Sequence, residues 1–247
     1  MTAQLRAELL KQRSTRTTLW LFSAMLGLVV LAILLHGFGL SAGILGRRSS
    51  QLAVLGQGQR LGTLFAALLG AVSITVEFRH GTIRPTFLAT PRRGRVVAAK
   101  VGVSMLIGIA FGLMATAIAA VVGSTSLAAR GLAIRLDAGD YALLLAGSAA
   151  GAGLWAAIGV GLGAVVRNQV PAVVGICTWL LFVEGLLFGD IGLSNVGRFL
   201  PGSLARAATG QDPLMLLAPS LAVPLLALYA AAAAAAGWAA TTRRDVA

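Results

Sequence analysis

Ionisable side chains are scarce in this 247-residue chain. Only 11% of the residues are charged, two are histidine, and Cys177 is the single cysteine. A soluble domain needs a larger polar share to cover its surface, so the composition argues against a water-soluble protein. A lone cysteine excludes an intrachain disulfide, and because Cys177 lies in an apolar run we interpret it as a small hydrophobic residue.

Several motifs of nucleotide and metal sites are also missing. Lys11 and Lys100 are the only lysines, and neither follows the glycines of a G-x-x-x-x-G-K-S/T phosphate loop. We therefore expect this chain to bind no cofactor, and any nucleotide site to lie on another polypeptide. His36 and His80 form no H-E-x-x-H motif, and the topology derived below separates them, which argues against a metal site. We expect His80 to be a loop contact and His36 to lie at an outer helix end.

Long apolar runs dominate what is present. The chain is 57% hydrophobic with a mean hydropathy of +0.87. The runs are about twenty residues long, which is the length of a helix that crosses a ~30 Å hydrocarbon core. They are continuous rather than alternating, which favours helices over a barrel. We predict an all-α integral membrane protein with a single transmembrane domain and six spans, at residues 19–40, 61–78, 101–124, 141–166, 171–188 and 217–240.

The segment before the first span is basic and partly amphipathic. In residues 1–18, three leucines alternate with cations, and Trp20 follows at the start of the span. We expect an interfacial helix with its apolar side toward the lipid. The first apolar run is too long for the hydrophobic region of a signal peptide, so we expect it to be retained.

The distribution of basic residues indicates an orientation. The formal net charge is +12, and six spans place both termini on one side of the membrane. If that side is the cytoplasm, 13 of the 20 Lys and Arg fall inside and seven outside, which is the expected bias. Four acids, Asp137, Asp140, Asp190 and Asp212, fall outside. The basic excess therefore orients the protein, and a nucleic-acid partner is not needed to explain it.

Small residues recur four apart within the spans. Gly108 and Gly112 form one such pair, and Gly159 and Gly163 another. Such pairs let two helices approach closely. We interpret them as general packing, with a subunit interface as the alternative.

The most informative stretch joins the second and third spans. It starts with a carboxylate, Glu77, at the end of an apolar run, and Gly81 can supply a bend. Thr82 can cap a following short helix, which Pro91 and Gly94 would end. A short cationic helix bracketed by turns suits a protein docking surface. The alternative is a loop that only follows the positive-inside rule, but the order Glu, Gly-Thr, Leu, Pro, Lys favours docking.

This stretch resembles the intracellular loop of ABC-2 type transporter permeases. The family pattern has an acid ending the second helix, a Gly-Thr step, a short hydrophobic helix, a proline and a basic residue leading into the third helix. The matching positions are Glu77, Arg79, Gly81, Thr82, Leu88, Pro91, Arg92 and Lys100. The N-terminal Glu8-Leu9-Leu10-Lys11 is also similar to the start of family members. With the six-span layout, the resemblance extends over nearly the whole chain.

The resemblance implies a function and partners. Permeases of this family work as dimers, so a second permease copy or a homologous permease is expected beside membrane lipid. The cytoplasmic segment 79–100 would be a coupling loop that docks on a separate ABC ATPase subunit, which carries ATP and Mg. Residues Arg79 to Arg95, with Arg92 and Arg93 central, would form the docking surface, and Glu77 would anchor it through an ion pair with a nearby arginine. Segment 189–216 would form extracellular re-entrant helices.

The expected activity is export across a bacterial cell membrane without enzymatic activity in this chain. The apolar spans suit a hydrophobic or amphipathic substrate such as a drug, an antibiotic peptide or a lipid, as in multidrug resistance. Glu184 is an acid within the fifth span, so it either lines the translocation pathway or outer gate, or is solvated at the outer interface.

Two other classes compete with this reading. An ion-coupled secondary transporter would need several intramembrane acids or histidines and inverted repeats, and the sequence offers one such acid and no convincing repeat. A membrane-embedded enzyme would need a reactive Ser, His or Asp cluster on facing spans, which the two histidines do not supply.

Overall fold

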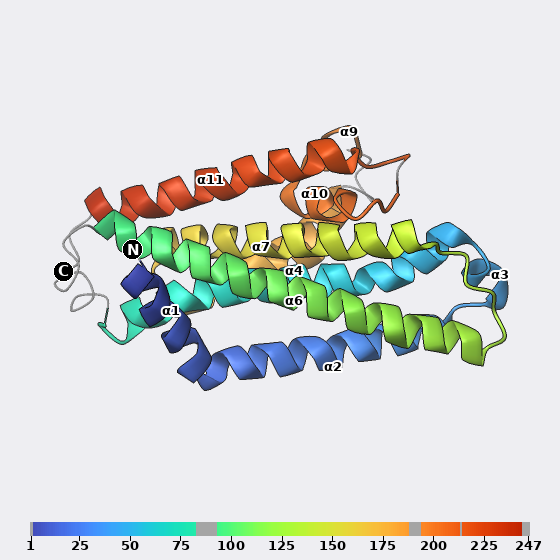
Figure 1. Cartoon of the computed structure of the whole chain (residues 1–247). Coiled ribbons are helices and arrows are strands. Elements are labelled where there is room, and N and C mark those ends of the chain that lie inside the picture. Colours follow the sequence, from blue (N-terminus) through green and yellow to red (C-terminus); the bar gives the residue numbers. More distant parts are fainter. Residues whose placement is uncertain (1, 83–92, 188–193, 213, 244–247) are drawn as a thin grey trace.

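The computed structural model describes residues 2–82, 93–187, 194–212 and 214–243, and the regular structure there is helical (Figure 1). Within these described ranges, five helices are long and apolar enough to cross a membrane. They are α2 (Arg16–Gly39), α4 (Arg48–Arg79), α6 (Arg93–Ala129), α7 (Ala138–Val166) and α11 (Pro219–Arg243). This architecture fits a membrane-embedded helical protein, which confirms the coarse prediction of fold class.

The predicted fifth span coincides with a shorter helical segment. Helix α8 (Gln169–Thr178) continues without a break into the π-helix η1 (Trp179–Val183), and helical geometry persists to Leu187. It is a shorter apolar helix than the five long ones. Six spans therefore stay a prediction. The remaining helices are short: α1 (Thr2–Ser14), α3 (Ala42–Leu45), α9 (Ser194–Gly197) and α10 (Pro201–Ala207).

Helix α4 forms the centre of the bundle. In its most apolar 18-residue stretch 78% of the residues are buried, against 17% in α2. Helix α2 buries only Met25, Val29, Ile33 and Gly37, a stripe with four-residue spacing, while Leu31 and Leu35 on its other sides are exposed. A helix that is apolar all round but buries one stripe is suited to a lipid environment.

Close packing around α4 and α7 depends on glycine. A Cβ atom on Gly108 of α6 would lie 2.8 Å from the carbonyl oxygen of Ala152 in α7. One on Gly163 of α7 would lie 2.8 Å from the carbonyl oxygen of Ala71 in α4, and one on Gly159 would collide with the carbonyl oxygen of Ala67. The two predicted glycine pairs therefore bring helices of one chain together, which confirms their interpretation as general packing.

Helix α4 begins thirteen residues before the predicted span 61–78. Gln51, Gln59 and Arg60 lower the mean hydropathy of this first part. Gln51 is nevertheless fully buried, and its hydrogen bonds offset the cost of burying a polar side chain. Its amide nitrogen donates to the carbonyl oxygens of Leu45 (2.9 Å) and Ala133 (3.0 Å). Hydropathy misses polar residues whose bonds are satisfied inside a bundle.

The start of α7 is set by a capping box. The Asp137 side chain accepts from the backbone N–H of Asp140, and the Asp140 side chain accepts from that of Asp137. Asp140 also binds the guanidinium of Arg48 at the start of α4. These contacts fix the ends of two core helices against each other.

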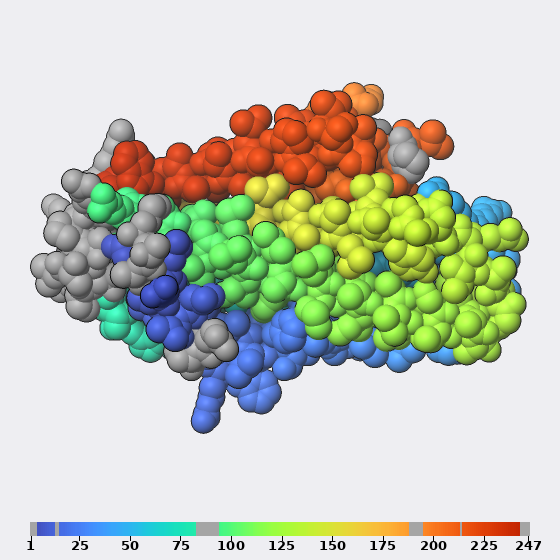
Figure 2. All heavy atoms as spheres, viewed as in Figure 1, coloured from blue at the N-terminus to red at the C-terminus, as the bar shows by residue number. Residues whose placement is uncertain are grey.

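The start of α1, the end of α11, the end of α4 and the start of α6 lie at one end of the bundle (Figure 1). Helix α3 and the α6–α7 connection lie at the opposite end. Figure 2 shows α2, α6, α7 and α11 side by side along the long axis. We call the end of the bundle with the start of α1 and the end of α11 the terminal end, and the end with α3 the distal end. An even number of membrane crossings requires the start of α1 and the end of α11 to lie at the same end of the bundle, as they do here.

Short helices occupy part of the predicted re-entrant segment 189–216. Helix α10 packs inward: Pro201, Leu204 and Ala205 are buried, and the indole nitrogen of Trp155 in α7 donates to the carbonyl oxygen of Pro201 (3.2 Å). Their location relative to the membrane stays a prediction.

Candidate functional site

Four charged side chains from three helices meet at the terminal end. Glu77 lies in the last turn of α4, and Lys100 lies in the second turn of α6. Glu8 and Lys11 lie three residues apart on α1, so they face the same side of that helix. We call these four residues the terminal ion cluster.

Each lysine of the cluster contacts both carboxylates. The Lys100 ammonium donates to Oε2 of Glu8 and to Oε1 of Glu77, both at 2.8 Å. The Lys11 ammonium donates to Oε1 of Glu8 at 2.9 Å and to Oε1 of Glu77 at 3.0 Å. Two positive charges thus balance two negative charges, which compensates for the cost of removing them from water.

Burial differs sharply between the two lysines. The Lys100 side chain is 2% exposed, whereas that of Lys11 is 46% exposed. Lys100 also donates to the backbone carbonyl of Ser73 (3.3 Å). Lys100 is therefore the central cation of the cluster, and Lys11 closes it on the outer side.

The α1 members keep their charges at neutral pH. Burial by itself would raise the pKa of Glu8, but the charges and hydrogen bonds of Lys100 and Lys11 outweigh it and lower that pKa. Burial would lower the pKa of Lys11, but hydrogen bonds to Glu8 and Glu77 outweigh it and raise that pKa. Each partner therefore stabilises the ionised form of the other.

A cavity of about 390 Å³ adjoins the cluster between the start of α2 and the end of α4. It is lined by the cluster itself, by hydroxyl side chains such as Thr15 and Thr18, and by apolar side chains such as Leu21 and Leu69. Within the described part of the chain, Oε2 of Glu77 is buried and has no hydrogen-bond partner. The cluster thus keeps one acceptor that its own residues do not satisfy.

The remaining predicted docking residues have different outcomes. Arg79 is exposed at the end of α4, and Gly81 has a φ of +67°, so the predicted bend at this glycine is present. Thr82 is exposed and lines the cavity. Leu88, Pro91 and Arg92 lie outside the described residues. Arg93 is the first residue of α6, and its side chain is also outside the description.

The partner expected for Glu77 is wrong. We expected an arginine, and the structure pairs Glu77 with the two lysines of the chain, one on α1 and one on α6. The sequence alone does not predict the pairing of Glu77 with Lys11, because 66 residues separate them. The sequence did offer one signal, the rarity of lysine. Its only two lysines, Lys11 and Lys100, are the two residues that pair with Glu77.

Comparisons with known proteins add no assignment. No family model matches this chain, and no curated protein matches it. The described residues also contain no group of three or more His, Cys, Asp or Glu side chains that could hold a metal ion.

Glu184 belongs to a separate site on the side of α4 toward the distal end. It follows the π-helix η1, in which backbone bonds join residues five apart, and its N–H donates to the carbonyl of Trp179. The same register brings the Trp179 indole nitrogen 2.5 Å from Oε1 of Glu184. Oε1 also accepts from the backbone N–H of Gly202 (2.8 Å), which ties this segment to α10. Wider helical turns of this kind are often found at functional sites.

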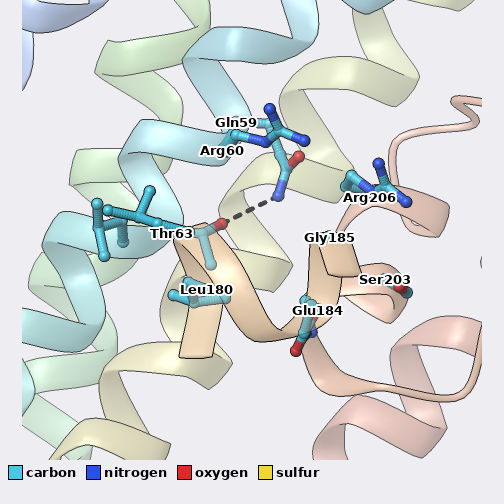
Figure 3. A pocket seen from close by; sticks show the side chains of 11 residues that line it. Gln59, Arg60, Thr63, Leu180, Glu184, Gly185, Ser203 and Arg206 are labelled. Atoms are coloured by element: carbon cyan, nitrogen blue, oxygen red, sulfur yellow. Dashed lines mark hydrogen bonds between the residues drawn. The ribbon is translucent and has the colours of Figure 1, made fainter. Parts of the chain in front are cut away.

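Glu184 is 7% exposed and lines a cavity of about 210 Å³ (Figure 3). Free solvation at an interface, one of the two alternatives for this residue, does not describe a side chain so buried. The cavity is also lined by Arg60 of α4 and Arg206 of α10, neither of which stands out in the sequence. Only the packing of α10 against the bundle reveals that these residues meet.

Proposed function

We propose that this chain is the membrane-spanning permease subunit of an ATP-driven exporter of the ABC-2 type, with ATP hydrolysis on a separate subunit. The observation that carries the proposal is the terminal ion cluster. It joins α1, α4 and α6 directly beside both ends of segment 83–92, which has the docking pattern of those permeases.

The cluster offers a route for mechanical coupling. A force applied between Gly81 and α6 acts on the last turn of α4 and the first turns of α6, and the cluster holds these turns to α1. Helices α4 and α6 pack through Gly58 and Gly62, where a Cβ atom would lie 2.7 Å and 3.1 Å from atoms of Ala115. Helices packed this closely move as units rather than bending separately, which suits rigid-body alternation of access.

The proposal includes partners and location. The ATPase subunit, carrying ATP and Mg, docks on segment 79–100 from the cytoplasm, and a second permease copy or a homologous permease completes the pathway. The complex exports a hydrophobic or amphipathic substrate across a bacterial cell membrane. An ion-coupled secondary transporter is the alternative class, and it would need no ATPase subunit.

The test uses a charge reversal at each end of α4. Arg79→Glu changes an exposed cation beside the docking segment, and Arg47→Glu changes an exposed cation just before the other end of the same helix. Each variant is co-expressed with an ABC ATPase subunit that co-purifies with the unaltered chain, and co-purification and ATP-dependent transport are measured. We expect Arg79→Glu to abolish stable co-purification or uncouple hydrolysis from transport, and Arg47→Glu to do neither.

Two results would contradict the proposal. One is transport by the chain alone, driven by an ion gradient and independent of any ATPase. The other is equal behaviour of the two charge-reversal variants, since a docking surface at the terminal end requires them to differ.

A further inference from the structure

The cavity of about 390 Å³ beside the terminal ion cluster changes from polar to apolar along its length. On α4 its lining begins with Glu77 at the terminal end and reaches Leu69, which precedes Glu77 by eight residues, about 12 Å along the helix axis. On α2 the lining includes Thr18 and, deeper in the bundle, Leu21. On both helices the deepest lining residue is therefore a leucine, and the polar groups lie nearer the terminal end.

A carboxylate oxygen at the polar end of this cavity is unsatisfied. Lys11 and Lys100 both donate to Oε1 of Glu77, at 3.0 Å and 2.8 Å. Oε2 of the same carboxylate is buried and accepts no hydrogen bond from any residue that the structure describes. The Glu77 side chain is only 10% exposed. A buried acceptor in this state is uncommon, and a bound molecule with a hydrogen-bond donor would satisfy it.

The hydroxyl groups in the lining also present acceptors. The Thr18 hydroxyl donates to Oε1 of Gln12 (3.0 Å), and the Thr15 hydroxyl donates to the backbone carbonyl of Gln12 (3.2 Å). The Ser73 hydroxyl donates to a carbonyl oxygen of its own helix (2.7 Å). A hydroxyl has one proton and two lone pairs, so these three side chains have committed their protons and keep lone pairs. The polar end is therefore suited to a headgroup that donates several hydrogen bonds.

The lysines on Glu77 indicate that this donor is uncharged. An ammonium group on Oε2 would be the third cation bound to one carboxylate, close to the ammonium groups of Lys11 and Lys100. Like charges at such a separation repel each other strongly in a partly buried site. A hydroxyl group donates to Oε2 without adding charge. The site therefore favours a hydroxyl-bearing headgroup over a cationic one.

The position and size of the cavity fit an amphiphile in the membrane. Trp20, which is 72% exposed, lies beside the lining residues of α2, and an exposed indole favours the membrane interface. The polar end of the cavity then lies at headgroup level, and its apolar end lies in the hydrocarbon region. A volume of about 390 Å³ is within the range of about 300–1,000 Å³ for pockets that enclose drug-sized ligands. The cavity can therefore hold a headgroup and the first part of its chain.

We propose that this cavity binds the hydroxyl-bearing headgroup of an uncharged amphiphile, such as a glycerol monoester or a glycoside, from the leaflet at the terminal end. One hydroxyl donates to Oε2 of Glu77, another donates to the hydroxyl oxygen of Thr18, and the chain extends along Val72 and Leu69. The bound molecule joins α2 to α4 beside the terminal ion cluster. Binding assumes no ATPase, whereas a role for the amphiphile as cargo would rest on the proposed function.

Binding is measured by photolabelling of the purified full chain in nanodiscs of dimyristoylphosphatidylcholine, a lipid whose headgroup has no hydrogen-bond donor. The probe is 1-O-dodecylglycerol with a diazirine in its chain, and mass spectrometry identifies the labelled peptides. The competitors are unlabelled 1-O-dodecylglycerol, the same ether with both hydroxyls methylated, and dodecylamine, which is cationic at neutral pH.

We expect the label in residues 17–21 or 69–76, which line the cavity on α2 and α4. Unlabelled 1-O-dodecylglycerol should displace the probe at a mole fraction in the bilayer at least about tenfold lower than either of the other competitors needs. A hydrogen bond to a charged group contributes a factor of that size or more.

Two variants locate the site without changing the terminal ion cluster. Thr18→Val removes one acceptor and keeps the side-chain shape, so it should weaken binding about two- to tenfold. Val72→Phe should abolish saturable labelling, because its ring takes the place of the chain. The matched controls are Thr125→Val and Val121→Phe on α6, two exposed positions outside the lining, and both should leave binding unchanged.

Glu77→Gln tests the unsatisfied oxygen. The amide oxygen of glutamine would face the two lysines, so the amide nitrogen, which is a donor, would take the place of Oε2. That nitrogen can donate to the methylated ether as well as to a hydroxyl. The preference for 1-O-dodecylglycerol over the methylated ether should therefore fall about tenfold.

Equal displacement by 1-O-dodecylglycerol and its methylated ether would overturn the proposal, as would unchanged labelling in both Thr18→Val and Val72→Phe. Stronger displacement by dodecylamine would overturn the hydroxyl headgroup in favour of a cationic one. Absence of saturable labelling at residues 17–21 and 69–76 would mean that the cavity holds only water. Because no ATPase is present, these results are independent of whether the co-purification experiment succeeds.

Discussion

At the scale of single residues, Lys11 and Lys100 form a natural comparison. They are the only lysines of the chain, and they donate to the same two carboxylates at nearly equal distances. They differ in exposure: the side chain of Lys11 is 46% exposed, and that of Lys100 is 2% exposed. The terminal ion cluster thus provides two lysines with the same partners and different access to water.

Replacing each lysine by methionine should show how much burial matters. Lys100→Met leaves two carboxylates in a buried site with only a half-exposed partner, and breaking a buried pair in this way costs about 3–5 kcal/mol. Lys11→Met should cost about 0–1 kcal/mol, because water screens and replaces an exposed ammonium. Thermal unfolding of the purified chain in neutral detergent measures both.

A double variant controls for the change in side-chain shape. Lys100→Met combined with Glu77→Gln removes one charge of each sign and should recover part of the lost stability. Equal losses in the two single lysine variants would mean that charge burial does not hold the cluster together.

At the scale of helices, the sequence predicts the long elements well and their ends poorly. The apolar runs locate α2, α6, α7 and α11, because a lipid-facing helix must be apolar over most of its surface. They underestimate α4, whose first thirteen residues include buried Gln51 and Gln59. A central helix is solvated by other helices, so its polar residues are tolerated once hydrogen-bonded, and hydropathy does not register that.

The candidate sites are likewise only partly predictable from the sequence. Glu77 and Glu184 stand out in the sequence because each is an acid at the edge of an apolar run. The residues that lie beside them do not stand out: Glu8 and Lys11 come from another helix, and Arg60 and Arg206, 146 positions apart, line one cavity only because α10 packs inward. Long-range pairing of this kind needs the tertiary structure.

Helix packing makes a prediction about two glycines. A Cβ atom on Gly159 of α7 would collide with the backbone of Ala67 in α4, whereas one on Gly27 of α2 would meet nothing within 4 Å. Gly159→Ala should therefore destabilise the bundle by about 1–3 kcal/mol through overpacking. Gly27→Ala should be neutral or stabilise it by up to about 1 kcal/mol, because alanine favours the helix.

Thermal unfolding in detergent again measures both variants, and because both substitutions are glycine to alanine, helix propensity cancels in the comparison. If Gly159→Ala were as stable as Gly27→Ala, then the close approach of α4 and α7 would not limit the packing of this fold.

At the scale of the whole molecule, two charged sites lie toward opposite ends of the central helix. The terminal ion cluster is formally neutral and is flanked by the basic segment 79–100, while the cavity lined by Arg60, Glu184 and Arg206 lies farther toward the distal end of α4. With the terminal end in the cytoplasm, the terminal ion cluster would face the ATPase subunit that we propose. The proposed coupling to an ATPase therefore depends on this orientation.

Labelling of introduced cysteines tests that orientation. Cys177 is the only native cysteine, so Cys177→Ala gives a background without thiols. Arg135→Cys then places an exposed thiol at the distal end, in the α6–α7 connection, and Thr242→Cys places one at the terminal end, in the last turn of α11. A membrane-impermeant maleimide applied to intact cells should label Arg135→Cys, and it should label Thr242→Cys only after the cells are permeabilised.

The reverse pattern would place segment 79–100 outside the cell, where no ATP is available to a docked ATPase, and the proposed coupling would fail. Labelling of both sites from outside would mean an odd number of crossings, in which case the α8–η1 segment does not span the membrane. Labelling of Arg135→Cys alone is explained by an even number of crossings, which requires α8 and η1 together to cross as the sixth span. The experiment thus decides the orientation and the sixth span from one pair of positions.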